Sequence, residues 1–352
     1  MKTKIIYSML ATMIISSSCE QEIVGQKIEN TPTNNYELLW KDFSEYYGQF
    51  EVKNIDWDSI NVVTRPLVND DMNEEEFYGI ITNMLSVLND PHVTLYPTTP
   101  DLPRWSIDLD QGVKTIDDFS YDLVKEKYVK QWFNQSGPIQ HGLLENNIGY
   151  IHIDQFEAGL KNTKKIMTGI LKDLQSTNGL VIDIRDTPGG RDPEAQLIAS
   201  YFTTEKQLYM TSRKKTGPGR NDFSDPLEWY INPMEKLYKS PIVLLTTRYT
   251  MSGAETFSLA MKTLDQVVHV GDTTGGAFSD DIMREMYNGW LYAISVGDYR
   301  DRNGISYEGR GLPPDKVIEN TPEEISQGTD KALELCHSIF EQLARTPEIS
   351  CL

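Results

Sequence analysis

The sequence contains few cysteines, and their spacing does not suit metal binding. Only Cys19, Cys336 and Cys351 occur in 352 residues. Because neither Cys-x-x-Cys nor His-Glu-x-x-His is present, we predict no zinc site, no other metal and no cofactor. Cys336 and Cys351 are able to pair in an oxidising compartment, but two cysteines near a chain end do not make a disulfide framework.

Basic residues are also scarce. The chain has 33 Lys and Arg against 52 Asp and Glu, a formal net charge of −19. Nucleic acids and anionic membrane surfaces are bound by clustered Lys and Arg, so we predict no nucleic-acid partner and no electrostatic membrane binding. The phosphate-loop patterns GxxxxGK[ST] and GxGxxG are absent as well. The negative charge favours solubility and identifies no substrate.

The apolar run at the start of the chain is short. It extends from Ile5 to Ile15, follows two lysines and is followed by three serines and Cys19. Such a run is too short to span a bilayer and is typical of a signal peptide. The position of Cys19 resembles a bacterial lipoprotein box, although Ser16 stands where that box usually has leucine. We expect a signal peptide over 1–18, lipidation of Cys19 and a cell-envelope location, with simple secretion as the alternative.

Apolar periodicity divides the rest of the chain. Helical spacing begins at Tyr36. A second helical pattern, which Asn73 and Glu76 open with a capping box, extends to Leu88. From residue 147 strand-like and helix-like segments alternate, which predicts an α/β fold with a mostly parallel sheet. The expected order is a lipid-anchored tether over 19–34, a helical subdomain over 35–96, an insertion or lid over 97–144, an α/β catalytic domain over 145–320 and a C-terminal helix over 321–352. Helices are expected at 158–175 and at 192–203, the latter with Asp192 as N-cap.

Ser252 stands between the strand-like run SPIVLLTT and the helix-like run GAETFSLAMKTL. At a helix N-terminus, free backbone N–H groups and the helix dipole favour an anion, as an acyl-transfer nucleophile requires. A serine that only caps a helix has the same sequence and is far commoner. The residues around Ser252 therefore leave both interpretations open.

A serine nucleophile needs a base, and the chain offers five histidines. His92, in NDPHVTL, lies at an abrupt helix-to-strand junction, where functional residues tend to occur. The other four are interpreted as structural or solvated: His141, His152, His269 and His337. Gly189 and Gly190, in RDTPGGRDP, allow the chain to bend sharply and to approach a ligand, although such a turn is weak evidence by itself.

Four motifs in order resemble those of the C-terminal processing, or tail-specific, serine peptidases: LVIDIRDTPGG, TMSGAETFSLAM, GDTTGG and YEGRGLPPD. The segments LLWKDFSEYYGQF and MLSVLNDPHVTL resemble the tricorn-like branch of that family. The resemblance covers residues 36–318. It implies a strand–helix layered fold of the ClpP/crotonase type and hydrolysis of peptide bonds in a peptide or protein substrate.

The resemblance also implies the roles of individual residues. Ser252 matches the family nucleophile, His92 the general base and Glu308 the acidic residue that orients the histidine. The oxyanion hole is expected from the backbone N–H groups of Gly253 and of Gly189 or Gly190.

The sequence departs from the family in three places. Ala277 stands where the tail-specific branch has its lysine, which excludes a Ser–Lys dyad; Lys262 is expected to lie away from the Ser252 hydroxyl. Pro91 replaces the serine that precedes the histidine in the tricorn core, and no segment resembles a PDZ domain. Two alternatives therefore remain: a non-catalytic binding protein on the same fold, as in the retinoid-binding relative, and a hydrolase of a non-peptide ester or amide. No oligomeric state is predicted.

Overall fold

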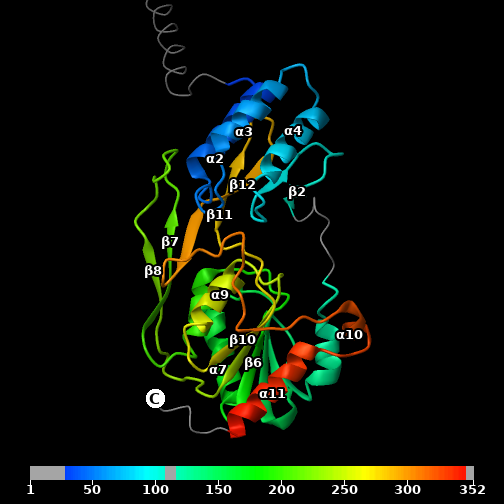
Figure 1. Cartoon of the computed structure of the whole chain (residues 1–352), viewed down its shortest axis with the longest axis vertical. Coiled ribbons are helices and arrows are strands. Elements are labelled where there is room, and N and C mark those ends of the chain that lie inside the picture. Colours follow the sequence, from blue (N-terminus) through cyan, green and yellow to red (C-terminus); the bar gives the residue numbers. More distant parts are fainter. Residues whose placement is uncertain (1–27, 108–115, 346–352) are drawn as a thin grey trace, which may run out of the picture.

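The computed structural model describes residues 28–107 and 116–345. The predicted signal peptide, Cys19 and Cys351 lie outside these residues. The chain forms two lobes (Figure 1): a smaller upper lobe that contains α2 to α4, and a larger lower lobe built around β6 and β10. Among the described residues, none of the helices combines the length and the apolarity needed to cross a membrane.

The lower lobe contains a seven-stranded sheet in the order β14-β10-β9-β6-β5-β4-β3. The first five of these strands run parallel, whereas β4 and β3 are antiparallel additions at one edge. The strands are β3 (Gln131–Asn134), β4 (Ile139–Leu144), β5 (Ile148–Ile153), β6 (Gly179–Asp183), β9 (Ile242–Thr246), β10 (Val267–Gly271) and β14 (Lys316–Val317). Strands β5, β6 and β9 are buried at every position, as expected of parallel strands that are covered on both faces.

Helices cover both faces of this sheet. On one face lie α7 (Leu160–Leu174), α8 (Asp192–Ala199) and α9 (Gly253–Met261), which share a core with Ile182 and Leu244. On the other face α11 (Lys331–Arg345) packs with Val181 and Val243. Neighbouring residues of β6 and β9 thus point to opposite layers, as strand geometry requires. The predicted layered α/β fold is confirmed.

The upper lobe packs helices onto an antiparallel sheet of order β11-β12-β1-β2. Its core joins Phe43 and Phe77 of the helices to Trp290 and Tyr292 of the β11–β12 segment. The capping box predicted at Asn73 is present. The elements are α2 (Pro32–Tyr46), α3 (Trp57–Thr64), the 3₁₀ turn η1 (Arg65–Leu67), α4 (Glu74–Ser86), β1 (Thr94–Tyr96), β2 (Trp105–Ser106), β11 (Asp281–Glu285) and β12 (Leu291–Ser295).

The structure differs from the predicted domain boundaries at two places. Strands β3 and β4 fall within the predicted insertion or lid over 97–144, yet they extend the sheet of the α/β lobe. Strands β11 and β12 fall within the predicted catalytic domain over 145–320, yet they complete the sheet of the upper lobe. Both differences arise because strand pairing joins segments that are distant in sequence, whereas the prediction followed local periodicity.

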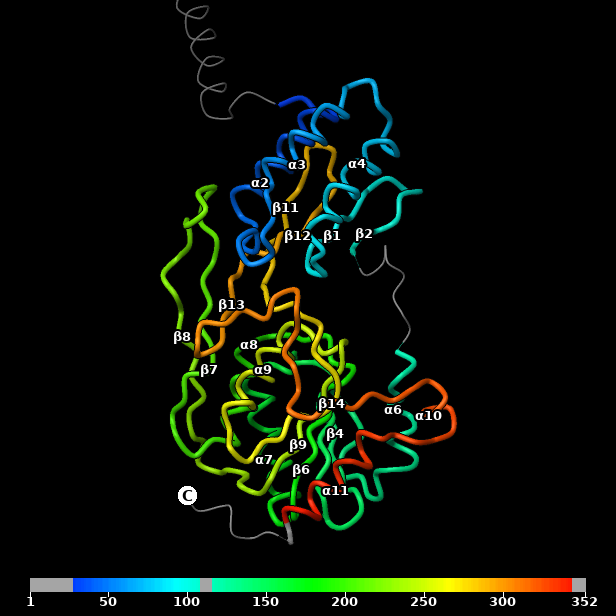
Figure 2. Tube along the Cα trace, in the orientation of Figure 1, coloured from blue at the N-terminus to red at the C-terminus, as the bar shows by residue number. Residues whose placement is uncertain are grey.

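A third sheet, of order β13-β7-β8, stands beside both lobes (Figure 2). It consists of β7 (Gln207–Lys214), β8 (Leu227–Ile231) and β13 (Gly297–Asp301). The remaining short elements are α6 (Tyr121–Leu123), the π turn η2 (Val124–Tyr128), the 3₁₀ turn η3 (Glu145–Asn147) and α10 (Pro322–Ser326). The single helix predicted over the C-terminal segment is therefore two helices, α10 and α11. Gly328, with a φ of +80°, lies between them.

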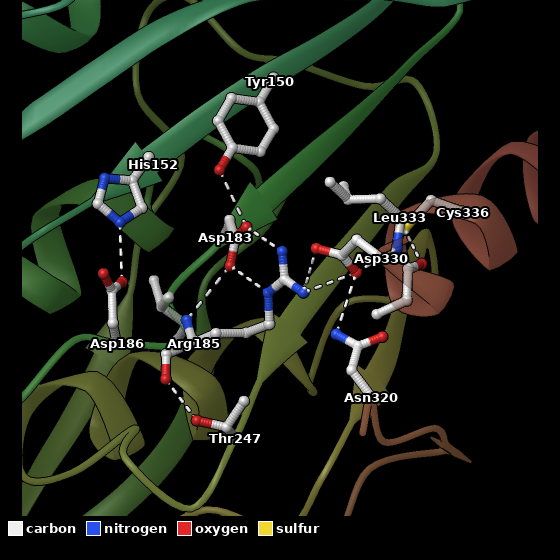
Figure 3. Close-up of polar contacts among 12 residues, drawn as sticks. Tyr150, His152, Asp183, Arg185, Asp186, Thr247, Asn320, Asp330, Leu333 and Cys336 are labelled. Atoms are coloured by element: carbon white, nitrogen blue, oxygen red, sulfur yellow. Dashed lines mark hydrogen bonds and ion pairs between the residues drawn. The ribbon is translucent and has the colours of Figure 1, made fainter. Parts of the chain in front are cut away.

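A buried charge cluster ties the sheet to α11 (Figure 3). The Arg185 guanidinium follows β6 and donates to both carboxylate oxygens of Asp183, at 2.9 and 2.7 Å, and to both oxygens of Asp330, at 3.0 and 2.8 Å. Asp330 in turn accepts the N–H of Leu333 in the first turn of α11 (3.2 Å). Each buried charge in the cluster is therefore paired, as low-dielectric surroundings require.

Candidate active site

Ser252 lies in the turn that joins β9 to α9, at the carboxyl end of the parallel sheet. Its backbone has a φ of 53° and a ψ of −124°, a conformation that a side chain with a Cβ rarely adopts. Strain of this kind costs about 1–3 kcal/mol and persists only where the surrounding structure enforces it. A strained serine between strand and helix is also the arrangement that presents a nucleophile above an α/β sheet.

The backbone conformation distinguishes Ser252 from an ordinary helix cap. Cap residues have extended backbones and accept a first-turn N–H with the side chain, as Thr31, Asn73 and Thr321 do here. Ser252 has a positive φ instead. Glu255 Oε2 accepts the Ser252 N–H (3.1 Å) and the Glu255 N–H donates to the Ser252 carbonyl (2.8 Å), so the two residues form a capping box on a strained backbone. The positive φ is therefore what separates Ser252 from an ordinary cap and favours the nucleophile interpretation.

Gly189 and Gly190 bring the loop after β6 against this serine. Their φ angles are +120° and +127°, which glycine adopts readily. A Cβ on Gly189 would lie 2.7 Å from the Ser252 Cβ and 2.9 Å from the Gly253 nitrogen, and one on Gly253 would lie 2.5 Å from the Gly190 oxygen. Within the described residues no hydrogen bond is donated by the N–H of any of the three glycines. These N–H groups are available to an oxyanion.

Glu255, a buried carboxylate that the sequence analysis missed, anchors the backbone of the serine. Its Oε2 accepts the N–H groups of Ser252 (3.1 Å) and Ala277 (2.8 Å), and its Oε1 accepts the Gly276 N–H (2.7 Å) and the Thr274 hydroxyl (2.5 Å). Burial raises the pKa of Glu255 to about 7, against the opposing effect of these four hydrogen bonds. Its position three residues after Ser252, where a capping box has its acid, was the available signal.

Glu308 enters the site from the loop that follows β13. Its Oε2 accepts the N–H of Phe278 (2.8 Å), next to Ala277, whose carbonyl accepts the Ser252 N–H (3.0 Å). Its Oε1 lies 3.2 Å from Lys53 Nζ of the upper lobe. Burial and the neighbouring Asp90 carboxylate raise the pKa of Glu308 to about 8, while the Lys53 ammonium opposes the rise.

The turn that carries His92 joins the same cluster. Asp90 accepts the His92 backbone N–H through Oδ1 (3.0 Å) and the Tyr47 hydroxyl through Oδ2 (3.0 Å), and its Oδ2 lies 4.0 Å from Lys53 Nζ. Asp90 is 1% exposed, so its charge is held away from water. Neither Asp90 nor Lys53 was singled out from the sequence, because an acid in a turn and a lysine in a polar loop are ordinary surface residues there.

The structure does not close a Ser–His–Glu relay. Among the described residues, no hydrogen bond joins His92 to Ser252 or to Glu308; His92 Nδ1 is buried without a hydrogen-bond partner, whereas Glu308 Oε1 has Lys53 Nζ as an ion-pair partner (3.2 Å). Catalytic hydrogen bonds are often long before substrate binds, and a buried unpaired atom at a site calls for a functional explanation. The three predicted residues thus come from different elements of two lobes, and they are linked through Asp90, Lys53 and the 276–278 backbone.

Asp192 was predicted as the cap of its helix, and this prediction is wrong. The N-cap of α8 is Arg191, and Asp192 is the first helical residue. Its carboxylate accepts the Thr256 hydroxyl (2.8 Å), in the first turn of α9, and the Tyr299 hydroxyl (3.1 Å). Burial raises the pKa of Asp192, and His92 acts in the opposite direction, so the imidazole lies within electrostatic range of this carboxylate of α8. The side chain therefore connects two helices.

Three of the other four histidines, and Lys262, have structural partners. His141 lies 3.0 Å from Asp173 and His152 lies 2.8 Å from Asp186. Burial lowers the pKa of His269 to about 3, and its Nε2 lies 2.7 Å from the Thr246 hydroxyl. His337 lies on α11. As expected, Lys262 lies at the far end of α9, where its Nζ pairs with Asp315 (2.7 Å).

The arrangement supplies the chemical parts of acyl transfer: a hydroxyl, N–H donors for an oxyanion, an imidazole and a carboxylate. Among the described residues, no group of three or more His, Cys, Asp or Glu side chains is placed to hold a metal ion.

Comparison with known proteins agrees with this geometry. A candidate peptidase from Parabacteroides merdae has a solved structure that superposes with a TM-score of 0.78 at 27% identity, over 89% of this chain and 97% of that one. The tricorn protease of Thermoplasma volcanium is 28% identical over 60% of this chain and 19% of its own length. A carboxy-terminal-processing protease of Bartonella bacilliformis is 23% identical over 67% of this chain and 50% of its own.

The chain thus spans half or less of the length of these two sequence relatives. Two family descriptions match it in separate segments. Residues 28–86 match the tricorn protease C1 domain, and residues 147–318 match peptidase family S41. The second segment contains Ser252, Gly189, Gly190 and Glu308, and His92 lies between the two. In agreement with the motifs, the chain therefore carries a peptidase family S41 domain preceded by a tricorn protease C1 domain.

Proposed function

We propose that the protein is a serine-type peptidase that hydrolyses peptide bonds through an acyl-enzyme on Ser252. In this proposal His92 is the general base, Glu308 orients and stabilises it, and the N–H groups of Gly253 and of Gly189 or Gly190 bind the oxyanion. The observation that carries the proposal is the strained backbone of Ser252, which lies against Gly189 and beside glycine N–H groups that donate no hydrogen bond among the described residues.

The proposed reaction follows from the roles of these groups. His92 takes the hydroxyl proton as Ser252 Oγ attacks the scissile carbonyl carbon, and the glycine N–H groups stabilise the negative oxygen of the tetrahedral intermediate. When the C–N bond breaks, the imidazolium returns the proton to the leaving amine. A water molecule, deprotonated by His92, then attacks the acyl carbon, and the collapse of the second intermediate releases the acid and restores Ser252.

The test uses residues 20–352 and the variants Ser252→Ala, His92→Ala and Glu308→Ala. A fluorophosphonate is added and the adduct is located by peptide mass. The proposal predicts an adduct on Ser252 in the parent protein, none in Ser252→Ala and much slower labelling in His92→Ala. If folded parent protein is not labelled, a non-catalytic binding protein on the same fold becomes the better interpretation. Cleavage of ester but not peptide panels would identify a hydrolase of another acyl group.

Substrate class and location are parts of the same proposal. We propose a peptide or protein substrate, since relatives are named as carboxy-terminal processing proteases, and no nucleic-acid partner, given the net charge of −19. We also propose that the protein is a cell-envelope lipoprotein whose membrane attachment is a lipid on Cys19. Mass spectrometry of the mature N-terminus tests this: a diacylglyceryl Cys19 supports it, whereas an unmodified N-terminus indicates simple secretion.

A further inference from the structure

Lys53 is nearly buried between the two lobes. It lies in the turn between α2 and α3, its side chain is 10% exposed, and its Nζ donates to the carbonyls of Asn89 (2.9 Å) and Leu88 (3.3 Å). These carbonyls belong to the turn that leads into His92. The same nitrogen lies 3.2 Å from Glu308 Oε1 in the lower lobe. One ammonium group therefore touches both the histidine-bearing turn and the carboxylate proposed to orient the histidine.

The charges around this ammonium explain why a cation is needed there. Glu308 and Asp90 are 3% and 1% exposed, and Glu255 adds a third buried carboxylate that raises the pKa of Glu308. The other groups that face Asp90 are neutral donors, the Tyr47 hydroxyl and the His92 backbone N–H. Among the described residues, Lys53 is the only basic side chain within 4.0 Å of either Glu308 or Asp90. Without a cation, adjacent buried carboxylates cannot both be ionised.

We infer that Lys53 is a positioning residue for the reaction: its ammonium favours the ionised form of Glu308 beside Asp90 and holds the His92 turn against that carboxylate. This inference rests on the proposed function for its catalytic meaning. Lys53 touches no reacting atom in that scheme and acts through Glu308 and the 88–90 backbone. Lys53 of the upper lobe thereby helps Glu308 of the lower lobe to carry the negative charge with which it can stabilise the His92 imidazolium.

The experiment measures how the rate constant of Ser252 labelling by a fluorophosphonate depends on pH in the parent, Lys53→Met, Asp90→Asn and the double variant. Removal of the Lys53 ammonium is expected to shift the acidic limb of the pH–rate profile to higher pH by about one unit or more, the pKa shift typical of a neighbouring opposite charge. Asp90→Asn should move the limb down, because it removes a like charge. The double variant should return close to the parent value, which a purely structural loss would not do.

Lys41→Met is the matched control. It makes the same substitution in the same lobe, at an exposed lysine that forms an ion pair with Glu45 (3.7 Å). Its profile should equal that of the parent, and thermal unfolding should show that all variants are folded at the assay temperature. The inference is overturned if Lys53→Met labels at the parental rate, or if it loses rate equally at every pH.

A second readout does not need activity. The Glu308 side-chain carboxyl is followed by ¹³C NMR titration and assigned by its loss in Glu308→Gln. Its titration midpoint should rise in Lys53→Met and recover in the double variant; an unchanged midpoint overturns the inference. If the parent is not labelled at all, the proposed function fails while this titration still decides whether Lys53 controls the ionisation of Glu308.

Discussion

Glu308 shows how burial and neighbouring charge set the chemistry of a single residue. An ordinary glutamate is ionised at neutral pH, but here burial and Asp90 raise the pKa of the carboxyl to about 8. The group that would stabilise an imidazolium is consequently protonated over much of the neutral range. Deprotonation of Glu308, rather than of His92, should therefore limit the reaction on the acidic side.

This predicts the pH dependence of activity. The rate of Ser252 labelling, and kcat/KM on any peptide that is cleaved, should rise with pH to a half-maximum near 8, because Glu308 must lose its proton to act. In Glu308→Gln the rate should be low and that limb should disappear. A parental half-maximum near 6.5, the ordinary value of histidine, would show that His92 alone governs the profile.

Glu255 permits a second test at the same scale. Four donors converge on its two carboxylate oxygens. In Glu255→Gln one oxygen becomes an NH₂ group that faces two of these donors, and each unsatisfied buried donor costs about 1–3 kcal/mol. Urea unfolding should show a loss of several kcal/mol, and labelling of Ser252 should be slower at every pH because its backbone loses an anchor. Parental stability in the variant would contradict the anchoring role.

The loop after β6 restricts substitution next to Ser252. Both of its glycines have positive φ; Gly190 approaches the backbone of Phe156 and Gly189 approaches the Ser252 Cβ, at distances that leave no room for a Cβ. The elements on either side, β6 and α8, are ordinary in their packing. The site therefore depends on close contact between two loop–helix junctions, each at the carboxyl end of a parallel strand.

Gly189→Ala tests that contact. The added methyl would lie 2.7 Å from the Ser252 Cβ at a φ of +120°, so the two loops must separate. Labelling of Ser252 should fall about 100-fold or more, the typical loss when an oxyanion donor is displaced. Gly169→Ala, in α7 with nothing within 4 Å of the new methyl, is the control. It should leave labelling unchanged and stabilise the fold by about 0.5–1 kcal/mol in urea unfolding.

At the scale of the whole molecule, two lobes share one site and one buried charge network supports the lower lobe (Figure 3). Asp330→Ala removes half of the partners of Arg185, which is 1% exposed, and leaves α11 without its first-turn acceptor. Asp183 still pairs with Arg185, but the Arg185 Nη1 and the Leu333 N–H lose their Asp330 acceptors, so the free energy of unfolding should fall by about 1–3 kcal/mol for each unsatisfied buried donor. Labelling per folded molecule should persist, since the cluster does not touch Ser252. A loss below 1 kcal/mol would indicate that water reaches Arg185.

Global stability should also depend on pH through the site. The pKa values of Glu255 and Glu308, about 7 and about 8, lie above the 4.5 expected in the unfolded chain. Between these pKa values the folded state therefore binds more protons than the unfolded chain. The stabilisation that results is complete below pH 4.5 and is lost as pH rises through 7 and 8. The thermal midpoint should fall between pH 6.5 and 8.5, a range above the titration of His269. In Glu308→Gln the thermal midpoint should fall less steeply with pH than in the parent. An equal slope would contradict the contribution assigned to Glu308.

Much of this protein follows from the sequence because the relevant forces are local. Strand and helix alternation, the caps at Asn73 and Thr321, and the strand–serine–helix order at Ser252 depend on residues within a few positions of one another. The motifs likewise predicted the family, whereas the assignment of His92 and Glu308 to Ser252 stays a prediction.

Tertiary structure alone decided how these groups act. The transfer of β11–β12 to the upper lobe, the hydrogen bonds of Glu255 with Gly276 and Ala277, and the ion pair of Glu308 with Lys53 each join residues that are far apart in sequence. Burial turned those polar residues into a coupled charge cluster, because the energy of a charge depends on its distance from water and from other charges. No local pattern in the sequence encodes those distances.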